Sequence, residues 1–177
     1  MHGQMMEVPL LVTEILRFAE RNYPDSQVVS VTFDDPRHRT TYRDVFRRAR
    51  KLANALTAAG VRAGDRVATV AWNDYRHLEI YYAVSCIGAV LHTINPRLFP
   101  EQLEYIVNHA ADRLLFVDPT LLPVVAPLAG KTPSVEKAIT SGIGWASRKV
   151  APHMTAARLS NGRWSSSRNG RSSAPTP

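Results

Sequence analysis

Residues 66–117 read RVATVAWNDYRHLEIYYAVSCIGAVLHTINPRLFPEQLEYIVNHAADRLLFV, and this stretch alternates between strand and helix patterns. The expected elements, in chain order, are a strand over 66–71, a helix over 74–87, a strand over 89–93, a helix over 100–108 and a strand over 113–117. Short connections between such elements require parallel pairing through right-handed crossovers. The stretch therefore predicts an α/β fold built on a doubly wound sheet.

The ends of these two helices carry recognisable signals. Asn73 is placed to cap the first helix, and Gly88 is placed to end it. Pro100 suits the first turn of the second helix. Outside this stretch, we expect a helix over 11–21, a strand over 28–33, a turn at 34–36, a strand over 39–42 and a strand over 135–139.

The clearest helix signal covers residues 42–58. Thr41 is positioned as its N-cap and Gly60 as its left-handed stop. One continuous apolar stripe runs along it, formed by Tyr42, Val45, Phe46, Ala49, Leu52, Ala53 and Leu56. The opposite face is basic, which we interpret as a solvated surface because no aromatic residues interleave the cations.

Composition limits the class of protein. The chain has 177 residues, of which 45% are hydrophobic, and a net charge of +7. A single cysteine, Cys86, excludes an internal disulfide and a multi-cysteine zinc site. The longest nearly apolar stretch, residues 83–91, is too short to span a bilayer, and residues 1–12 lack the pattern of a signal peptide. We therefore expect no transmembrane segment and a cytoplasmic location.

The basic charge is concentrated in residues 140–177. This region holds six basic residues and no acidic one, and serine, glycine and proline fill 15 of its 38 positions. Too little apolar side-chain surface is present to offset the entropy of ordering, so we expect a basic, Ser/Arg/Gly/Pro-rich disordered tail. Nucleic-acid binding through this tail is an alternative function, although its charges form no compact cluster.

The sequence shows no catalytic, cofactor-binding or metal-binding residues. Neither a GxGxxG nor a GxxxxGK[ST] phosphate loop occurs, and the histidines lack the spacing of metal ligands. We interpret several chemically capable side chains as structural, either buried or satisfying turns and helix ends: Asp34, Asp35, Asp65, Asp74, Cys86, His92 and His109.

Seven segments nevertheless resemble one family in their order and spacing. They are residues 40–44 (TTYRD), 60–68 (GVRAGDRVA), 72–73 (WN), 77–79 (HLE), 88–98 (GAVLHTINPRL), 100–110 (PEQLEYIVNHA) and 115–118 (LFVD). Together they are similar to the amino-terminal part of the AMP-forming acyl-CoA synthetases of the adenylate-forming superfamily. The HTINPRL run most resembles the medium- and long-chain fatty-acid CoA ligases.

The resemblance implies an activity and its cofactors. Such ligases use ATP and Mg to convert a fatty acid to an acyl-adenylate, and then transfer the acyl group to coenzyme A. The family's phosphate loop, adenine and magnesium motif and catalytic lysine lie beyond the matched segments. Thr140-Ser141-Gly142 is not that loop, because Trp145 and Ala146 stand where the loop has small hydroxyl residues and glycines. We therefore expect no cofactor bound by this chain, and ATP, Mg and CoA only in the full-length family.

The resemblance also predicts the domain organisation. Residues 10–139 are expected to form a partial amino-terminal AMP-binding domain, and residues 140–177 to be a frameshifted tail. The chain would then be a truncated ligase, inactive alone. The faces around residues 28–33 and 42–58 should lack partners, which favours self-association. A non-catalytic module that forms a homodimer or pairs with a full-length ligase is the alternative.

Overall fold

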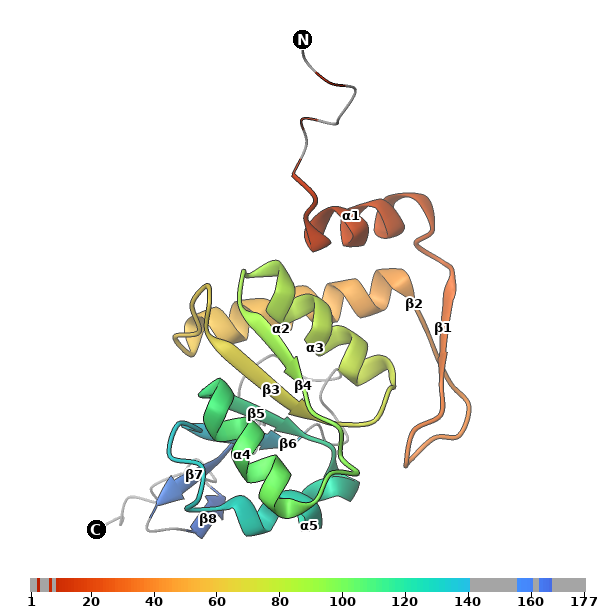
Figure 1. The fold of residues 1–177 in the computed structure, drawn as a ribbon. Helices are drawn as coiled ribbons and strands as arrows, with labels where there is room; N and C mark the ends of the chain where they lie inside the picture. Colours follow the sequence, from red (N-terminus) through yellow and green to blue (C-terminus); the bar gives the residue numbers. More distant parts are fainter. Residues whose placement is uncertain (1–2, 4–6, 8, 141–155, 161–162, 167–177) are drawn as a thin grey trace, which may run out of the picture.

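The computed structural model describes residues 3, 7, 9–140, 156–160 and 163–166 (Figure 1). Its helices are α1 (Val12–Asn22), α2 (Tyr42–Ala58), α3 (Tyr75–Cys86), α4 (Pro100–Ala110), α5 (Leu122–Val125) and the 3-10 turns η1 (Pro119–Leu121) and η2 (Ala126–Leu128). Its strands are β1 (Gln27–Ser30), β2 (His38–Thr41), β3 (Arg66–Val70), β4 (Val90–Thr93), β5 (Leu114–Val117), β6 (Lys137–Thr140), β7 (Ala156–Ser160) and β8 (Arg163–Ser166). The expected strand and helix order between residues 11 and 139 is confirmed.

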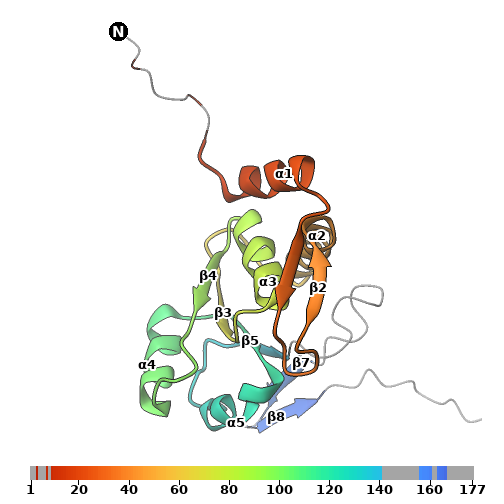
Figure 2. The ribbon, with the colours of Figure 1, turned by 90° about the vertical axis from the view of Figure 1, so that its right-hand side faces the viewer.

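The main sheet has the order β4-β3-β5-β6-β7-β8. Strands β3, β4, β5 and β6 pair in parallel, whereas β7 and β8 join antiparallel. Strands β1 and β2 form a separate antiparallel hairpin at one side of the molecule (Figure 2). The predicted doubly wound parallel sheet is therefore confirmed.

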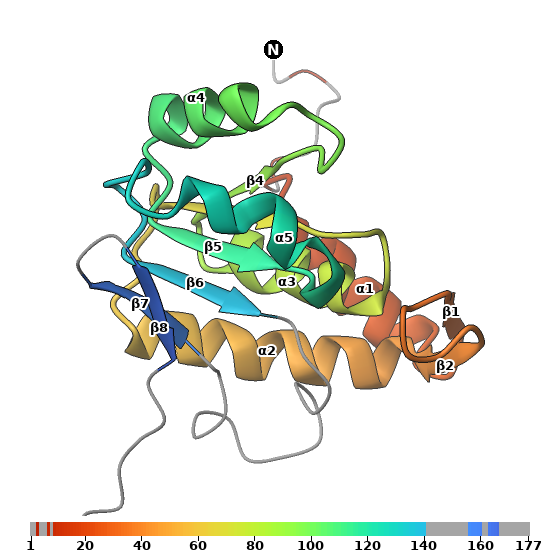
Figure 3. The same cartoon turned by 90° about the horizontal axis from the view of Figure 1, so that it is seen from below.

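Helices cover the parallel strands on both faces (Figure 3). Alternate side chains of β3 and β5 explain this, because neighbouring strand residues point to opposite faces. Val67 and Phe116 pack with α2 and α3, whereas Ala68 and Leu115 pack with α4 and the helical turns after β5. All four residues of β5 are buried, so the strand requires a helix layer on each face.

Helix α2 begins and ends where the sequence predicts. The Thr41 hydroxyl accepts a hydrogen bond from the Asp44 amide at 3.3 Å, and Gly60 adopts a left-handed φ of 88°. The predicted cap of α3 is wrong by one residue. Asp74, rather than Asn73, caps this helix, because its carboxylate accepts hydrogen bonds from two backbone amides.

The expectation of two unpartnered faces is half right. The apolar stripe of α2 is buried against α1, α3 and the sheet; Val45, Phe46, Ala49, Leu52 and Leu56 are its buried members. That part of the expectation is wrong, because α3 returns across the sheet and covers the stripe. The outer side chains of residues 29, 31 and 33 are exposed, as expected.

Most of residues 140–177, where the sequence predicts a disordered tail, lies outside the described part of the chain. The described segments within this range, β7 and β8, form strands next to β6. Among all described residues, no helix combines the length and the hydropathy needed to cross a lipid bilayer.

The two-faced burial of β5 leads to a stability prediction. Phe116 is fully buried, so Phe116→Ala should lower the free energy of unfolding by about 3–5 kcal/mol. Phe99→Ala removes the same ring from a side chain that is 72% exposed, and it should change stability by no more than about 0.5 kcal/mol. Urea denaturation of both variants checks this, and equal losses would contradict the assignment of β5 as the centre of the core.

Candidate functional site

The carboxyl ends of the parallel strands form the candidate site. Along the chain, β3 leads outward to β4, and the chain then returns past β3 to β5 and β6. The strand order therefore reverses between β3 and β5, which is where ligands bind in open α/β sheets. The segments that meet there follow β3 (residues 71–74), β4 (residues 94–99) and β5 (residues 118–120).

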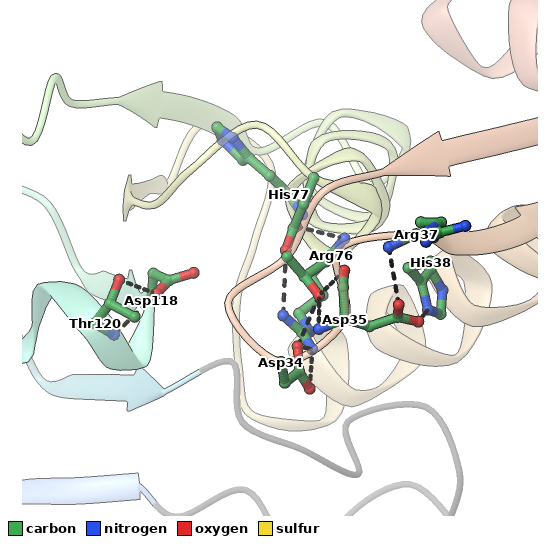
Figure 4. A network of polar contacts seen from close by, with 10 residues as sticks. Asp34, Asp35, Arg37, His38, Arg76, His77, Asp118 and Thr120 are labelled. Atoms are coloured by element: carbon green, nitrogen blue, oxygen red, sulfur yellow. Dashed lines mark hydrogen bonds and ion pairs between the residues drawn. The ribbon is translucent and has the colours of Figure 1, made fainter.

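Aspartates close the helix ends that face this edge (Figure 4). Asp74 Oδ1 accepts hydrogen bonds from the amides of Arg76 at 2.8 Å and His77 at 3.1 Å. After β5, Asp118 Oδ1 accepts from the Thr120 amide at 2.9 Å and from its hydroxyl at 2.7 Å. Backbone amides at a helix start can bind phosphate only when they are free. These amides are already occupied by carboxylates of the chain.

The described residues therefore do not fit the triphosphate of ATP at this edge. The β3–α3 connection, residues 71–74, contains no glycine that would let backbone amides converge on a phosphate. Within the described ranges, no group of three or more His, Cys, Asp or Glu side chains is placed to hold a metal ion.

An aromatic side chain links the ends of β3 and β5. The Trp72 indole Nε1 donates to the Thr120 hydroxyl at 3.0 Å, and the Arg97 guanidinium lies over the Trp72 ring at 5.9 Å. Both Trp72 and Arg97 are exposed. Among the described residues, the Arg97 guanidinium is exposed and contacts the Trp72 ring, so it gives this edge a positive charge.

Arg76 fixes the hairpin loop beside the same edge. Its guanidinium is almost completely buried and donates to both Asp34 carboxylate oxygens, at 2.8 and 2.9 Å, and to Asp74 at 3.2 Å. It also lies over the Phe33 and Tyr75 rings, at 5.2 and 5.0 Å. The hydrogen bonds from Arg76 lower the pKa of the Asp34 carboxyl group.

A second arginine joins α2 to α3. Arg48 Nε donates to Glu79 at 2.5 Å, and Glu79 is fully buried. Another nitrogen of Arg48 donates to the Thr40 hydroxyl at 3.1 Å, and the guanidinium lies 5.4 Å from the Tyr75 ring centre. Arg48 therefore connects β2, α2 and α3 within a buried polar cluster.

Most of the chemically capable residues picked out from the sequence have structural contacts. His92 Nδ1 lies 2.8 Å from buried Asp112, whose pKa is raised by burial although His92 opposes the shift. His109 stacks on Tyr105, and half-buried Cys86 packs beside the α1–α2 core. Asp65 accepts from Arg113 at 2.7 Å. These residues lie apart from the carboxyl edge and do not assemble into one site.

The interpretation of the basic face of α2 as solvated is wrong for Arg48, which is mostly buried against Glu79. The buried charges Arg76 and Glu79 are not predicted from the sequence either. His77, whose ring nitrogen lies 3.0 Å from the Thr69 hydroxyl, was also missed; burial lowers its pKa. One signal was available for two of them. Arg76 and Glu79 interrupt the apolar pattern of a helix between two buried strands, where an unpaired charge would be costly.

Comparison with known proteins identifies the family. The AMP-binding enzyme family matches residues 16–165. The chain belongs to this family. Over 142 residues the chain is 48% identical to 3-methylmercaptopropionyl-CoA ligase of Ruegeria lacuscaerulensis. The matched segment covers 80% of this chain and 26% of the relative. Over 136 residues it is 47% identical to the medium-chain-fatty-acid–CoA ligase of Ectopseudomonas oleovorans, covering 77% of this chain and 25% of the relative.

A solved structure shows the same fold. The N-terminal domain of FACL13 from Mycobacterium tuberculosis superimposes with a TM-score of 0.68 at 26% identity, over 75% of this chain and 34% of that one. This AMP-binding family member thus spans about a quarter of the length of the two curated relatives. The resemblance to acyl-CoA ligases inferred from the sequence is confirmed.

The buried Arg48–Glu79 pair of this family member should be important for stability. Arg48→Met leaves the Glu79 carboxylate buried without its arginine, so we expect a loss of about 3–5 kcal/mol in the free energy of unfolding. Arg47→Met, on the next position of α2, removes an exposed pair with Asp44 and should cost at most about 1 kcal/mol. Chemical denaturation measures both, and a loss below that of Arg47→Met would refute the assigned role of Arg48.

The Asp34–Arg76 contact predicts a pH dependence. The folded-state pKa of Asp34 is lowered, so its contribution to stability is present above the unfolded-state pKa of about 4 and is lost as pH falls through the folded-state value. Asp34→Asn should therefore make stability less dependent on pH below about 4. Asp25→Asn, at an 81%-exposed carboxylate, is the control and should leave the profile unchanged. Thermal melts between pH 2 and 7 provide the measurement.

Proposed function

We propose that this chain supplies the amino-terminal sheet of a fatty acyl-CoA ligase and is inactive alone. The reaction of such a ligase joins a carboxylic acid to the AMP moiety of ATP with release of pyrophosphate, and then transfers the acyl group to the thiol of coenzyme A with release of AMP. The observation that carries the proposal is the carboxyl edge. Sequence identity to CoA ligases is high across this sheet, yet aspartates occupy its helix-start amides.

ATP, magnesium and coenzyme A would accordingly bind to residues outside this sheet. The chain's contribution is structural: the sheet, its two helix layers and the hairpin fixed by Arg76 form one supporting unit. Arg97 would add a positive charge near polyanionic substrates, because it is exposed at the edge. Since ATP and coenzyme A are intracellular metabolites, we propose a cytoplasmic location.

The proposed acid substrate is a fatty acid, with its chain length left open. Relatives with names that specify two different acids are 48% and 47% identical to this chain over nearly the same length. Nearly equal sequence identity to two ligases with names that specify different acids supports a common scaffold role for this segment. Selection of the acyl chain is then a property of the remaining three quarters of such a ligase.

A second candidate is a non-catalytic module that forms a homodimer or pairs with a full-length ligase. It is favoured by the exposed apolar face of α1, where Leu11, Ile15 and Phe18 are each more than half exposed. Nucleic-acid binding through the basic tail, residues 140–177, has less support, because the six basic residues of the tail form no compact cluster. The basic face of α2 adds little to it. On α2, Arg43, Arg47 and Arg50 are each paired with a carboxylate, which leaves little free charge for phosphates.

For residues 140–177 we propose frameshifted translation. The support is the sudden change to an acid-free composition after Ile139. The family match extends to residue 165, past the position where this proposal places the frameshift, and this counts against the proposal until the reading frame is examined directly. Sequencing the encoding DNA from codon 130 in three frames should reveal a second frame that continues with a Ser/Thr/Gly-rich loop ending in Pro-Lys-Gly. Absence of such a frame would overturn this proposal.

A chimera tests the scaffold function. Residues 10–139 replace the matching segment of the medium-chain ligase of Ectopseudomonas oleovorans, and ATP–pyrophosphate exchange is measured with a medium-chain fatty acid. We expect exchange by the chimera and none by the 177-residue chain. Loss of exchange in a chimera that melts like the parent ligase would contradict the scaffold role, and exchange by the chain alone would contradict its inactivity.

A further inference from the structure

The β1–β2 hairpin is held on the body of the protein by side chains from both of its strands and from its loop, among them Val28, Thr40 and Asp34. It forms its own two-stranded sheet and has no strand pairing with the main sheet. At its loop, Asp34 binds Arg76 of α3, as described above. At the start of β2, the His38 ring stacks on the Tyr75 ring of α3, with centres 3.9 Å apart and planes inclined by 19°. His38 therefore lies directly in the contact between hairpin and helix.

The two ring nitrogens of His38 have different surroundings (Figure 4). Nδ1 faces the Asp35 carboxylate at 3.5 Å. Nε2 is buried and has no hydrogen-bond partner among the residues that the structure describes. A neutral imidazole with its hydrogen on Nδ1 leaves a lone pair at Nε2. A protonated imidazole must instead bury a charged N–H donor there without an acceptor, which is much more costly.

Two guanidinium groups lie near the Tyr75 ring on which His38 stacks. From α2, the Arg48 guanidinium lies 5.4 Å from the Tyr75 ring centre, and from α3 the Arg76 guanidinium lies 5.0 Å from it. The carboxylates that balance these arginines, Glu79 and Asp34, are already hydrogen-bonded to them.

Asp35 is the remaining acidic group that faces His38. Its side chain is half exposed, and it also accepts a hydrogen bond from the Arg37 amide. Attraction to a solvated carboxylate at 3.5 Å is modest. It does not compensate for a buried N–H donor that has no acceptor.

We propose that His38 is a pH-sensitive latch: protonation of its ring weakens the Tyr75 stack and loosens the β1–β2 hairpin from α3. The test below spans pH 7.5 to 5.5, a range over which an ordinary imidazole becomes protonated. The Asp34–Arg76 contact persists in this range, because the lowered pKa of Asp34 keeps its carboxylate charged. The inference concerns the chain itself and does not depend on the proposed ligase function.

Hydrogen–deuterium exchange of the 177-residue chain tests the latch. Protection of the amides of residues 27–41 is compared at pH 7.5 and 5.5, after correction for the intrinsic effect of pH on exchange. We expect protection in the hairpin to fall by about tenfold at pH 5.5, while β3 and β5 keep theirs. Equal hairpin protection at both pH values would overturn the proposal.

Variants separate the latch from general acid sensitivity. His38→Phe retains a flat ring for the stack but cannot be protonated, so its hairpin protection should be the same at both pH values. His109→Phe is the matched control, because His109 also stacks on a tyrosine but is exposed; it should behave like the parent protein. If the phenyl ring disturbs packing, His38→Gln serves as the second non-titrating variant. A pH-dependent loss in a folded His38 variant would overturn the proposal.

Discussion

The structure depends on covering both faces of β5. Each of its four side chains is buried, so a helix layer is needed on either side, and parallel neighbours must supply the hydrogen bonds at both edges. The right-handed crossovers then place α3 on one face and α4 on the other. Because the strand order reverses beside β5, the same constraint also creates the carboxyl edge where this fold class binds ligands.

At that edge the chain satisfies its own helix ends. Asp74 and Asp118 occupy amides that a phosphate would need, and Arg76 is bound to the hairpin through Asp34. Charges that a catalytic site would direct toward substrate are used here to fix elements relative to one another. These contacts support the proposed scaffold role, as does the similarity of the chain to CoA ligases with names that specify different acids.

Local signals in the sequence were sufficient for most of the fold. Residues close together in the chain determine three features that are predicted correctly: the apolar stripe of α2, its Thr41 cap, and the buried strands β3 and β5. Contacts between distant residues were not predicted. Arg48 reaches Glu79 across 31 positions and Arg76 reaches Asp34 across 42, and no periodicity encodes such partners. The burial of the α2 stripe was missed for the same reason.

The central claim is that carboxylates of the chain, rather than a nucleotide, occupy the helix starts at the carboxyl edge. Backbone NMR of the chain during titration with Mg-ATP tests it most directly. The account predicts that the amides of Arg76, His77 and Thr120 keep their chemical shifts as nucleotide is added. Saturable shifts at these three amides, which would mean that phosphate displaces Asp74 or Asp118, would contradict it.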